Sequence, residues 1–196
     1  LQRLVATLIA FFLAVGVAAH ALDELKGRPL RTGIPGAQLV AATVLSLSGA
    51  VVLGAFGVLR VGPALIPFIV VGAALVVVYD LELVGGRLHN DLVFAAAWGA
   101  FPVLTAYFAQ AGTVSLAAVA GAVAAFALSA AQRHLSGAAR TLRRRTAEVE
   151  GVVVFADGTT RPITRALLLG PLEGALKALC WAVVAVAVAV AVARMG

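Results

Sequence analysis

The sequence predicts an all-α integral membrane protein, a bundle of about six transmembrane helices that carries a small cytoplasmic β-hairpin. Of its 196 residues, 62% are hydrophobic and 12% are charged, and the mean hydropathy is +1.05. This composition excludes an ordinary water-soluble globular domain, because about a quarter of the residues in such domains are charged. Apolar runs of about 20 residues, the length at which a helix crosses a bilayer, recur along the whole chain.

The apolar runs define the expected helices in order. They fall at residues 4–22, 37–59, 62–78, 92–110, 114–131 and 175–192. Alanine, valine and glycine dominate the runs, and such small residues let helices pack closely inside a membrane. Basic residues follow the first run and no small-residue cleavage pattern does, so we expect a membrane helix there and not a cleaved signal peptide.

The distribution of charge predicts how these helices are oriented. The net charge is +6, and the basic residues gather after the first run and after the fifth, where Arg143, Arg144 and Arg145 are consecutive. The positive-inside rule then places the loops after the first, third and fifth runs in the cytoplasm, and we expect the plasma membrane of a bacterium. Topology and attraction to anionic lipids explain these arginines, so no nucleic-acid partner is expected.

A polar segment near the C-terminal end divides the chain into three expected parts. Residues 1–134 form a five-helix bundle with a polar cytoplasmic mouth, residues 135–169 a basic connector, and residues 170–196 the final helix. Within the connector, β-prone residues flank Asp157 and Gly158, a pair that favours a hairpin with a type I′ turn. A two-stranded hairpin is marginally stable alone, so we expect it to rest on the bundle or on a partner. The hairpin would then be a simple connector between the fifth and sixth spans or, alternatively, a lid over the polar site described next.

The polar end of the first run concentrates the most chemistry. One helical face carries, at spacings i, i+3, i+4 and i+8, the side chains of His20, Asp23, Glu24 and Arg28, and Arg31 follows. Polar groups at a hydrocarbon boundary are costly unless they are paired, hydrated or bound to a ligand. This cluster is therefore a candidate functional site.

The loop after the third run is expected on the same side of the membrane. It contains Tyr79, Asp80, Arg87, His89 and Asp91. A loop that only had to be soluble would be rich in Lys and Glu, whereas this one is rich in His, Asp, Arg, Asn and Tyr. We therefore expect the two polar segments to meet in one site, with a solvated rim of the bundle as the alternative.

Two chemistries fit these residues. In the first, Mg²⁺ bound by carboxylates holds a phosphorylated lipid, since carboxylate oxygens suit a hard cation and guanidinium groups bind phosphate. The metal ligands would be Asp23, Glu24, Asp80 and Asp91, and the phosphate contacts Arg28, Arg31 and Arg87. In the second, Zn²⁺ or iron is held by His20, His89 and either Asp23 or Glu24. The structural alternatives are an interhelical hydrogen bond for His20 and ion pairs for the acidic residues.

The same region resembles the UbiA-type intramembrane prenyltransferases. That family has an Asn-Asp-x-x-Asp-x-x-x-Asp motif at a helix end, followed by an arginine and a proline-rich turn. The matching residues here are Asp23, Arg28, Pro29, Arg31, Ile34, Pro35 and Gly36, and residues 99–107 resemble the family's glycine-to-proline helix. The resemblance spans about residues 15–107. It implies transfer of a prenyl group from a prenyl diphosphate, with Asp23 as an Mg²⁺ ligand and Arg28 at the diphosphate. Tyr79 falls roughly where the family has a tyrosine, and we expect it to bind the substrate.

The chain also departs from the family pattern. His20-Ala21 stands where the family has Asn-Asp, Gly27 replaces the last Asp, and the second acidic motif has no counterpart. We therefore expect a diverged, shortened relative, with Asp23, Glu24 and Asp80 as its catalytic residues. Its ligand would be a membrane lipid or a prenyl diphosphate. The alternatives are a His/Asp metalloenzyme and a non-enzymatic accessory subunit, whose small-residue helices would dock on partner subunits or on a second copy.

Overall fold

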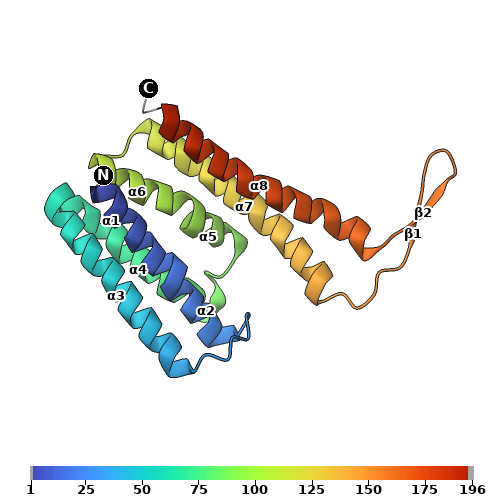
Figure 1. The fold of residues 1–196 in the computed structure, drawn as a ribbon, viewed down its shortest axis with the longest axis horizontal. Coiled ribbons are helices and arrows are strands. Elements are labelled where there is room, and N and C mark those ends of the chain that lie inside the picture. The colour runs from blue at the N-terminus through green and yellow to red at the C-terminus, as the bar shows by residue number, and fades with distance from the viewer. Residues whose placement is uncertain (1, 194–196) are drawn as a thin grey trace. The chain divides into compact units, whose positions relative to one another are not determined.

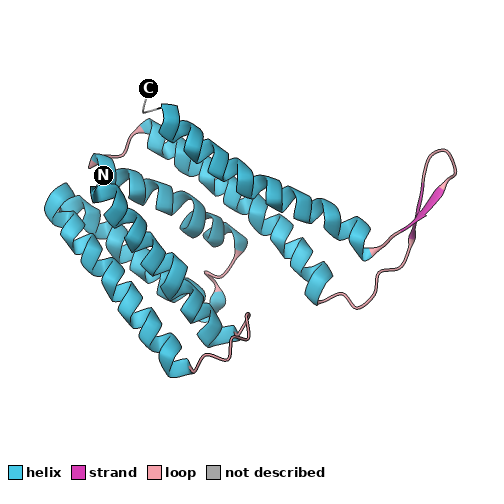
Figure 2. Ribbon diagram, viewed as in Figure 1, coloured by secondary structure: helices cyan, strands magenta, loops and turns pink. Residues whose placement is uncertain are grey.

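The computed structural model describes residues 2–193, and nearly all of its regular structure is helical (Figures 1 and 2). The helices are α1 (Gln2–Phe11), α2 (His20–Gly27), α3 (Gly36–Val61), α4 (Ile66–Asp80), α5 (Asp91–Ala95), α6 (Phe101–Ala111), α7 (Leu116–Arg144) and α8 (Arg165–Ala193). Short 3₁₀ turns lie at Pro63–Leu65 and Val84–Gly86, and π-helical segments at Phe12–Ala19 and Ala96–Ala100. The two strands are β1 (Val152–Val154) and β2 (Thr160–Pro162).

These helices provide six stretches that are long and apolar enough to cross a membrane. They are Gln2–Gly27, Gly36–Val61, Pro63–Asp80, Asp91–Ala111, Leu116–Arg144 and Arg165–Ala193. Each expected apolar run overlaps one of them, so the predicted number and order of helices are confirmed. Their length and composition support an integral membrane protein.

The chain divides into two compact units, Leu1–Ala127 (unit 1) and Leu128–Gly196 (unit 2). The division falls inside α7, and the boundary expected at residue 134 lies inside the same helix. The basic connector expected at residues 135–169 is also partly helical, since α7 continues to Arg144 and α8 begins at Arg165.

The core of unit 1 is built from small side chains. Ala18, Ala19 and Leu22 pack with Val76 of α4, which is 1% exposed. Such small residues let the backbones of α1–α2, α3 and α4 approach closely. The core thereby positions the neighbouring ends of α2 and α4.

Two π-helical segments contribute to this core. Phe12–Ala19 supplies Ala18 and Ala19, and Ala96–Ala100 supplies Trp98, which packs against the same cluster. A π-helical turn is wider than an α-helical one and occurs often at functional sites. The apolar pattern does not predict either segment, because both read as ordinary apolar helix.

The opposite end of unit 1 is held by Arg3. Its Nη1 donates to the carbonyl oxygen of Gln110 at 3.2 Å and its Nη2 to that of Arg60 at 3.2 Å. These carbonyls belong to the last turns of α6 and α3, where backbone acceptors lack helical partners and carry partial negative charge. The Gln110 amide also donates to Thr7 Oγ1 at 3.0 Å. Arg3 therefore joins the start of α1 to the ends of two other helices.

In unit 2, β1 and β2 form the expected antiparallel hairpin, with Val153 opposite Arg161. Its turn differs from the expected type I′. The amide of Gly158 donates to the Phe155 carbonyl at 2.9 Å, and positive φ occurs within the turn only at Gly158, at +82°. A type I′ turn needs positive φ at two successive residues, so this is a type I turn followed by a left-handed glycine.

The Asp157 side chain explains the turn that forms. Its Oδ1 accepts hydrogen bonds from the amide of Thr159 at 2.9 Å and from its hydroxyl at 2.7 Å. Such a bond to a residue two positions on stabilises a turn without left-handed backbone at the aspartate. The Thr159 hydroxyl and amide also hold the pKa of the Asp157 carboxyl below its usual range.

Two arginines connect the helices of unit 2. Arg143 of α7 forms an ion pair with Glu173 of α8. Arg165, the first residue of α8, donates to the carbonyl oxygens of Thr146 and Ala147, both at 2.8 Å. At least one member of the arginine triplet thus has a structural role.

Candidate functional site

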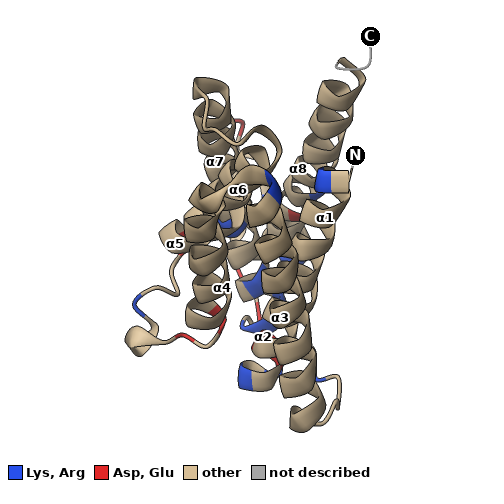
Figure 3. Ribbon diagram, turned by 90° about the vertical axis from the view of Figure 1, so that its left-hand side faces the viewer, with Lys and Arg blue, Asp and Glu red and all other residues tan. Residues whose placement is uncertain are grey.

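The ends of α2 and α4 lie side by side, and both carry charged residues (Figure 3). Lys26 Nζ donates to the Leu81 carbonyl at 3.0 Å and pairs with the Glu82 carboxylate at 2.6 Å. One turn earlier on α2, Asp23 is close enough to Asp80 for their charges to interact. The two polar segments that were expected to meet therefore do meet.

Asp80 is the most unusual group of this region. It is the last residue of α4 and is 5% exposed, and its Oδ2 has no hydrogen-bond partner among residues 2–193. A buried carboxylate oxygen without a partner is costly unless a proton or a cation compensates it. The nearby carboxylate of Asp23 adds to that cost, because like charges repel. Burial and the neighbouring charge therefore favour either a proton on Asp80 or a bound cation.

An aromatic wall lies next to this pair. Tyr79 is 4% exposed, and its ring stacks on that of His89 at a centroid distance of 4.5 Å and meets Trp98 edge-on at 5.7 Å. His89 Nδ1 lies 3.1 Å from the Tyr79 carbonyl oxygen. Since a carbonyl only accepts, Nδ1 carries a proton in this bond, and in the neutral ring Nε2 is then the acceptor.

Glu24 has a different environment from Asp80. Its Oε2 accepts from the Leu30 amide at 3.0 Å, and its Oε1 accepts from the amide of Thr32 at 2.9 Å and from its hydroxyl at 3.0 Å. The residue is 3% exposed. Both oxygens are thus engaged by the protein itself, and they hold the loop at residues 28–35 against α2.

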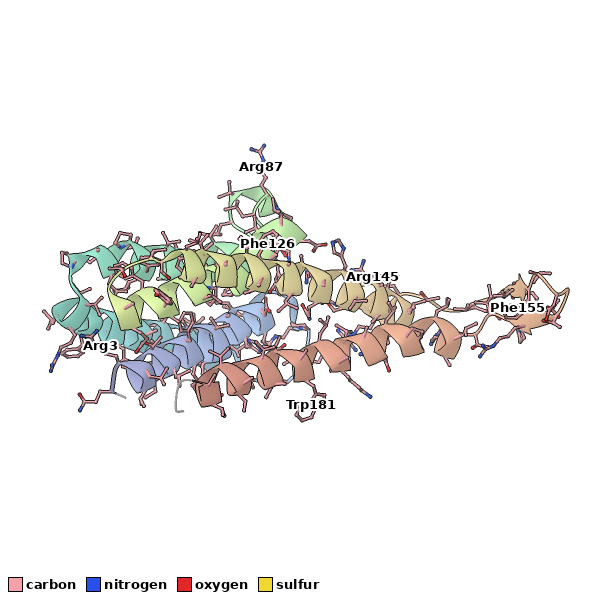
Figure 4. The ribbon with its side chains drawn as sticks, turned by 90° about the horizontal axis from the view of Figure 1, so that it is seen from above. Arg3, Arg87, Phe126, Arg145, Phe155 and Trp181 are labelled. Carbon is pink, nitrogen blue, oxygen red and sulfur yellow. The ribbon has the colours of Figure 1, made fainter. Side chains whose placement is uncertain are left out.

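The expected phosphate-binding arginines are placed in different ways. Arg28 Nη1 donates to the Ile34 carbonyl at 2.7 Å, so this side chain stabilises its own loop. Arg31 is exposed in the same loop. Arg87 projects outward from the loop after α4 (Figure 4). The basic residue that lies at the junction is Lys26, which the sequence suggested only as an ion-pair partner of Asp23 or Glu24 and which instead pairs with Glu82.

The remaining predicted ligands lie at helix starts. His20 is the exposed first residue of α2, and Asp91 is the exposed first residue of α5, where the helix dipole favours a carboxylate. Across the described part of the chain, no group of three or more His, Cys, Asp or Glu side chains is arranged to hold a metal ion. A zinc or iron centre takes three or four protein ligands, whereas Mg²⁺ commonly takes one or two carboxylates together with substrate phosphates. The donor set therefore fits Mg²⁺ with a phosphate better than it fits zinc or iron.

Comparison with known proteins leaves the family open. No family model, curated protein or solved structure matches the chain. The resemblance to UbiA-type prenyltransferases depends on the motif residues around Asp23 and Arg28, and it stays a prediction. What the candidate site offers chemically therefore follows from its own geometry, which is a pair of carboxylates at the junction of α2 and α4.

Proposed function

We propose that the protein is a membrane-embedded receptor for a phosphorylated or diphosphorylated lipid, which it binds through a divalent cation held by Asp23 and Asp80. The observation that carries this proposal is the buried Oδ2 of Asp80, which no group of residues 2–193 hydrogen-bonds and which lies near a second carboxylate. Mg²⁺ retains several waters and is bound by few protein carboxylates when phosphates complete its shell. A two-carboxylate site fits that pattern.

The surrounding residues have supporting roles in this proposal. Lys26 and Glu82 neutralise each other beside the site, and they hold the ends of α2 and α4 together. Glu24 anchors the loop that exposes Arg31, whose guanidinium supplies a bidentate phosphate contact. When bound, Mg²⁺ neutralises phosphate charge. With a prenyl diphosphate, the same neutralisation would favour departure of the diphosphate, so prenyl transfer is the reaction class this site would support.

The test compares two Asp→Asn variants in nanodiscs. Asp80→Asn keeps the shape of the side chain and removes its charge, and Asp157→Asn is the matched control in the hairpin of unit 2. We expect Asp80→Asn to weaken Mg²⁺-dependent binding of farnesyl diphosphate more than about tenfold, since even residues that only orient a metal ligand contribute that much. Isothermal titration calorimetry with Mg²⁺ and with EDTA measures this. The proposal would be refuted if both variants bound farnesyl diphosphate with equal affinity, or if EDTA did not weaken binding by the wild type.

A further inference from the structure

Unit 1 contains a cavity of about 470 Å³ between α1, α3, α4 and α6. Its lining extends from Gln2 along α1 and into the π-helical segment as far as Ala14, about 18 Å at ~1.5 Å per residue. On α4 it ends at Ala73, two turns before Asp80. The cavity is therefore separate from the carboxylate pair and reaches the other end of the bundle.

The walls of this cavity are mostly apolar. Small residues such as Ala10, together with the rings of Phe68 and Phe101, make up much of the lining, and no Asp or Glu of the described chain takes part. Gly54 brings α3 against α4, because a Cβ at this position would lie 2.9 Å from Ile69. Apolar side chains of this kind favour contact with an apolar part of a ligand. Its volume is within the range of small-molecule sites.

Polar groups occur at two places in the lining. The exposed side chains of Arg3 and Arg60 lie where the cavity reaches the end of the bundle, which Arg3 marks in Figure 4. Arg3 uses two of its five N–H groups on helix carbonyls, so three are left for a ligand. Deeper in the cavity, the buried Oγ1 of Thr105 has no hydrogen-bond partner among residues 2–193. Two cations at the mouth of an apolar cavity complement an amphiphile with an anionic head group.

We propose that this cavity binds one acyl chain that carries an anionic head group. The head group lies at Arg3 and Arg60, and the chain extends along α1 toward Ala14 of the π-helical segment and Ala73 of α4. A free fatty acid and one chain of an anionic phospholipid share this chemistry. The site does not depend on the cation site at Asp80.

Photolabelling locates the ligand. The full-length protein in phosphatidylcholine nanodiscs is exposed to palmitate that carries a diazirine in its chain, and labelled peptides are identified by mass spectrometry. We expect the probe to label α1 and α4, and excess unlabelled palmitate to suppress this labelling. Methyl palmitate should not suppress it, because the ester lacks the negative charge. Labelling confined to α8, or equal suppression by the two competitors, would overturn the proposal.

Two matched pairs of variants test the chain site and the head-group site separately. Ala10→Phe fills the cavity, whereas Ala41→Phe changes an exposed residue of α3 outside it. We expect Ala10→Phe alone to weaken palmitate binding about tenfold, since a filled cavity has no room for the chain. Arg60→Gln should weaken binding about fivefold and Arg87→Gln should not. Indistinguishable affinities within either pair would overturn the proposal, and the arginine pair decides it if Ala10→Phe does not fold.

Two further arms identify the source of the ligand and separate the two proposals. Replacing phosphatidylcholine with phosphatidylglycerol should displace the probe if an anionic phospholipid is the natural occupant, and should leave it bound if the occupant is a free fatty acid. Asp80→Asn should leave palmitate binding unchanged, because the cavity ends before that residue. Loss of palmitate binding in Asp80→Asn would contradict the independence of the cavity site.

Discussion

Lys26 connects the end of α2 to the turn that follows α4. Its ammonium group donates to the Leu81 carbonyl and pairs with Glu82, whose other oxygen lies 4.0 Å from His89 Nδ1. The hydrogen bond from Lys26 holds the pKa of the Glu82 carboxyl below its usual range. Because the pKa is lower in the folded than in the unfolded protein, the stability from this contact is present at neutral pH. It is lost as the pH falls through the folded-state pKa.

This linkage predicts that acid loosens the loop after α4. We expect the amides of residues 81–90 to exchange hydrogen faster below the folded-state pKa of Glu82 than at neutral pH, after correction for intrinsic rates, because the protonated carboxyl no longer pairs with Lys26. Lys26→Met should produce the fast exchange already at neutral pH, whereas Lys177→Met, the control in α8, should not. Hydrogen exchange with mass spectrometry measures both. Equal exchange in the Lys26 and Lys177 variants at neutral pH would contradict the prediction.

At the residue scale, the sequence predicted that Asp23 and Asp80 come near each other, but not what each predicted side chain does. Asp23, Glu24 and Asp80 were assigned one role from residue type and spacing. The structure separates Glu24 from the other two, because the loop after α2 folds back and its Leu30 and Thr32 amides donate hydrogen bonds to that carboxylate. Along this path the loop has left-handed backbone at Arg28 and Arg31, with φ of 48° and 51°. Spacing along a helix carries no information about such a loop path.

At the scale of single elements, the core depends on how tightly the π-helical segment Phe12–Ala19 packs. Ala18 is completely buried there and lies in the same cluster as Val76 of α4. Inside a membrane, close packing of small side chains provides much of the attraction between helices. A larger side chain at residue 18 would push these elements apart.

Ala18→Leu is therefore expected to destabilise unit 1 by about 1–3 kcal/mol, the usual cost of overpacking a core. Ala182→Leu is the matched control, since Ala182 is exposed on α8. The free energy of unfolding in mixed detergent micelles, followed by circular dichroism, compares the two variants. If Ala18→Leu were as stable as Ala182→Leu, the close packing at residue 18 would be refuted.

The elements were predictable to different degrees. The six long helices follow from the lengths of the apolar runs, because backbone polar groups in a membrane must be satisfied within the segment. The hairpin follows from its β-prone flanks, but its turn type depends on the bonds that Asp157 makes to Thr159. The π-helical segment Phe12–Ala19 packs against Val76 of α4, and a local apolar pattern does not distinguish it from ordinary α-helix.

At the scale of the whole molecule, charge separates the two ends of unit 1. Arg3 and Arg60 lie at one end, and the other charged residues of the unit lie in or beside the loops that follow α2 and α4. This separation was predictable, because consecutive spanning helices alternate in direction. The mouth of the cavity at Arg3 and Arg60 and the carboxylate pair therefore lie at opposite ends of unit 1.

The topology of the chain can be tested with single cysteines. In a Cys180→Ala background, cysteines at Arg31, Arg87 and Ala156 fall in the loops after the first, third and fifth spans, and one at Thr113 falls between the fourth and fifth. We expect a membrane-impermeant maleimide to label the first three only in permeabilised cells and Thr113→Cys in intact cells, because basic loops face the cytoplasm. Labelling of all four from one side would show that a predicted span does not cross the membrane. The opposite pattern would keep the six spans but reverse the orientation, and would place the site at Asp80 outside the cytoplasm.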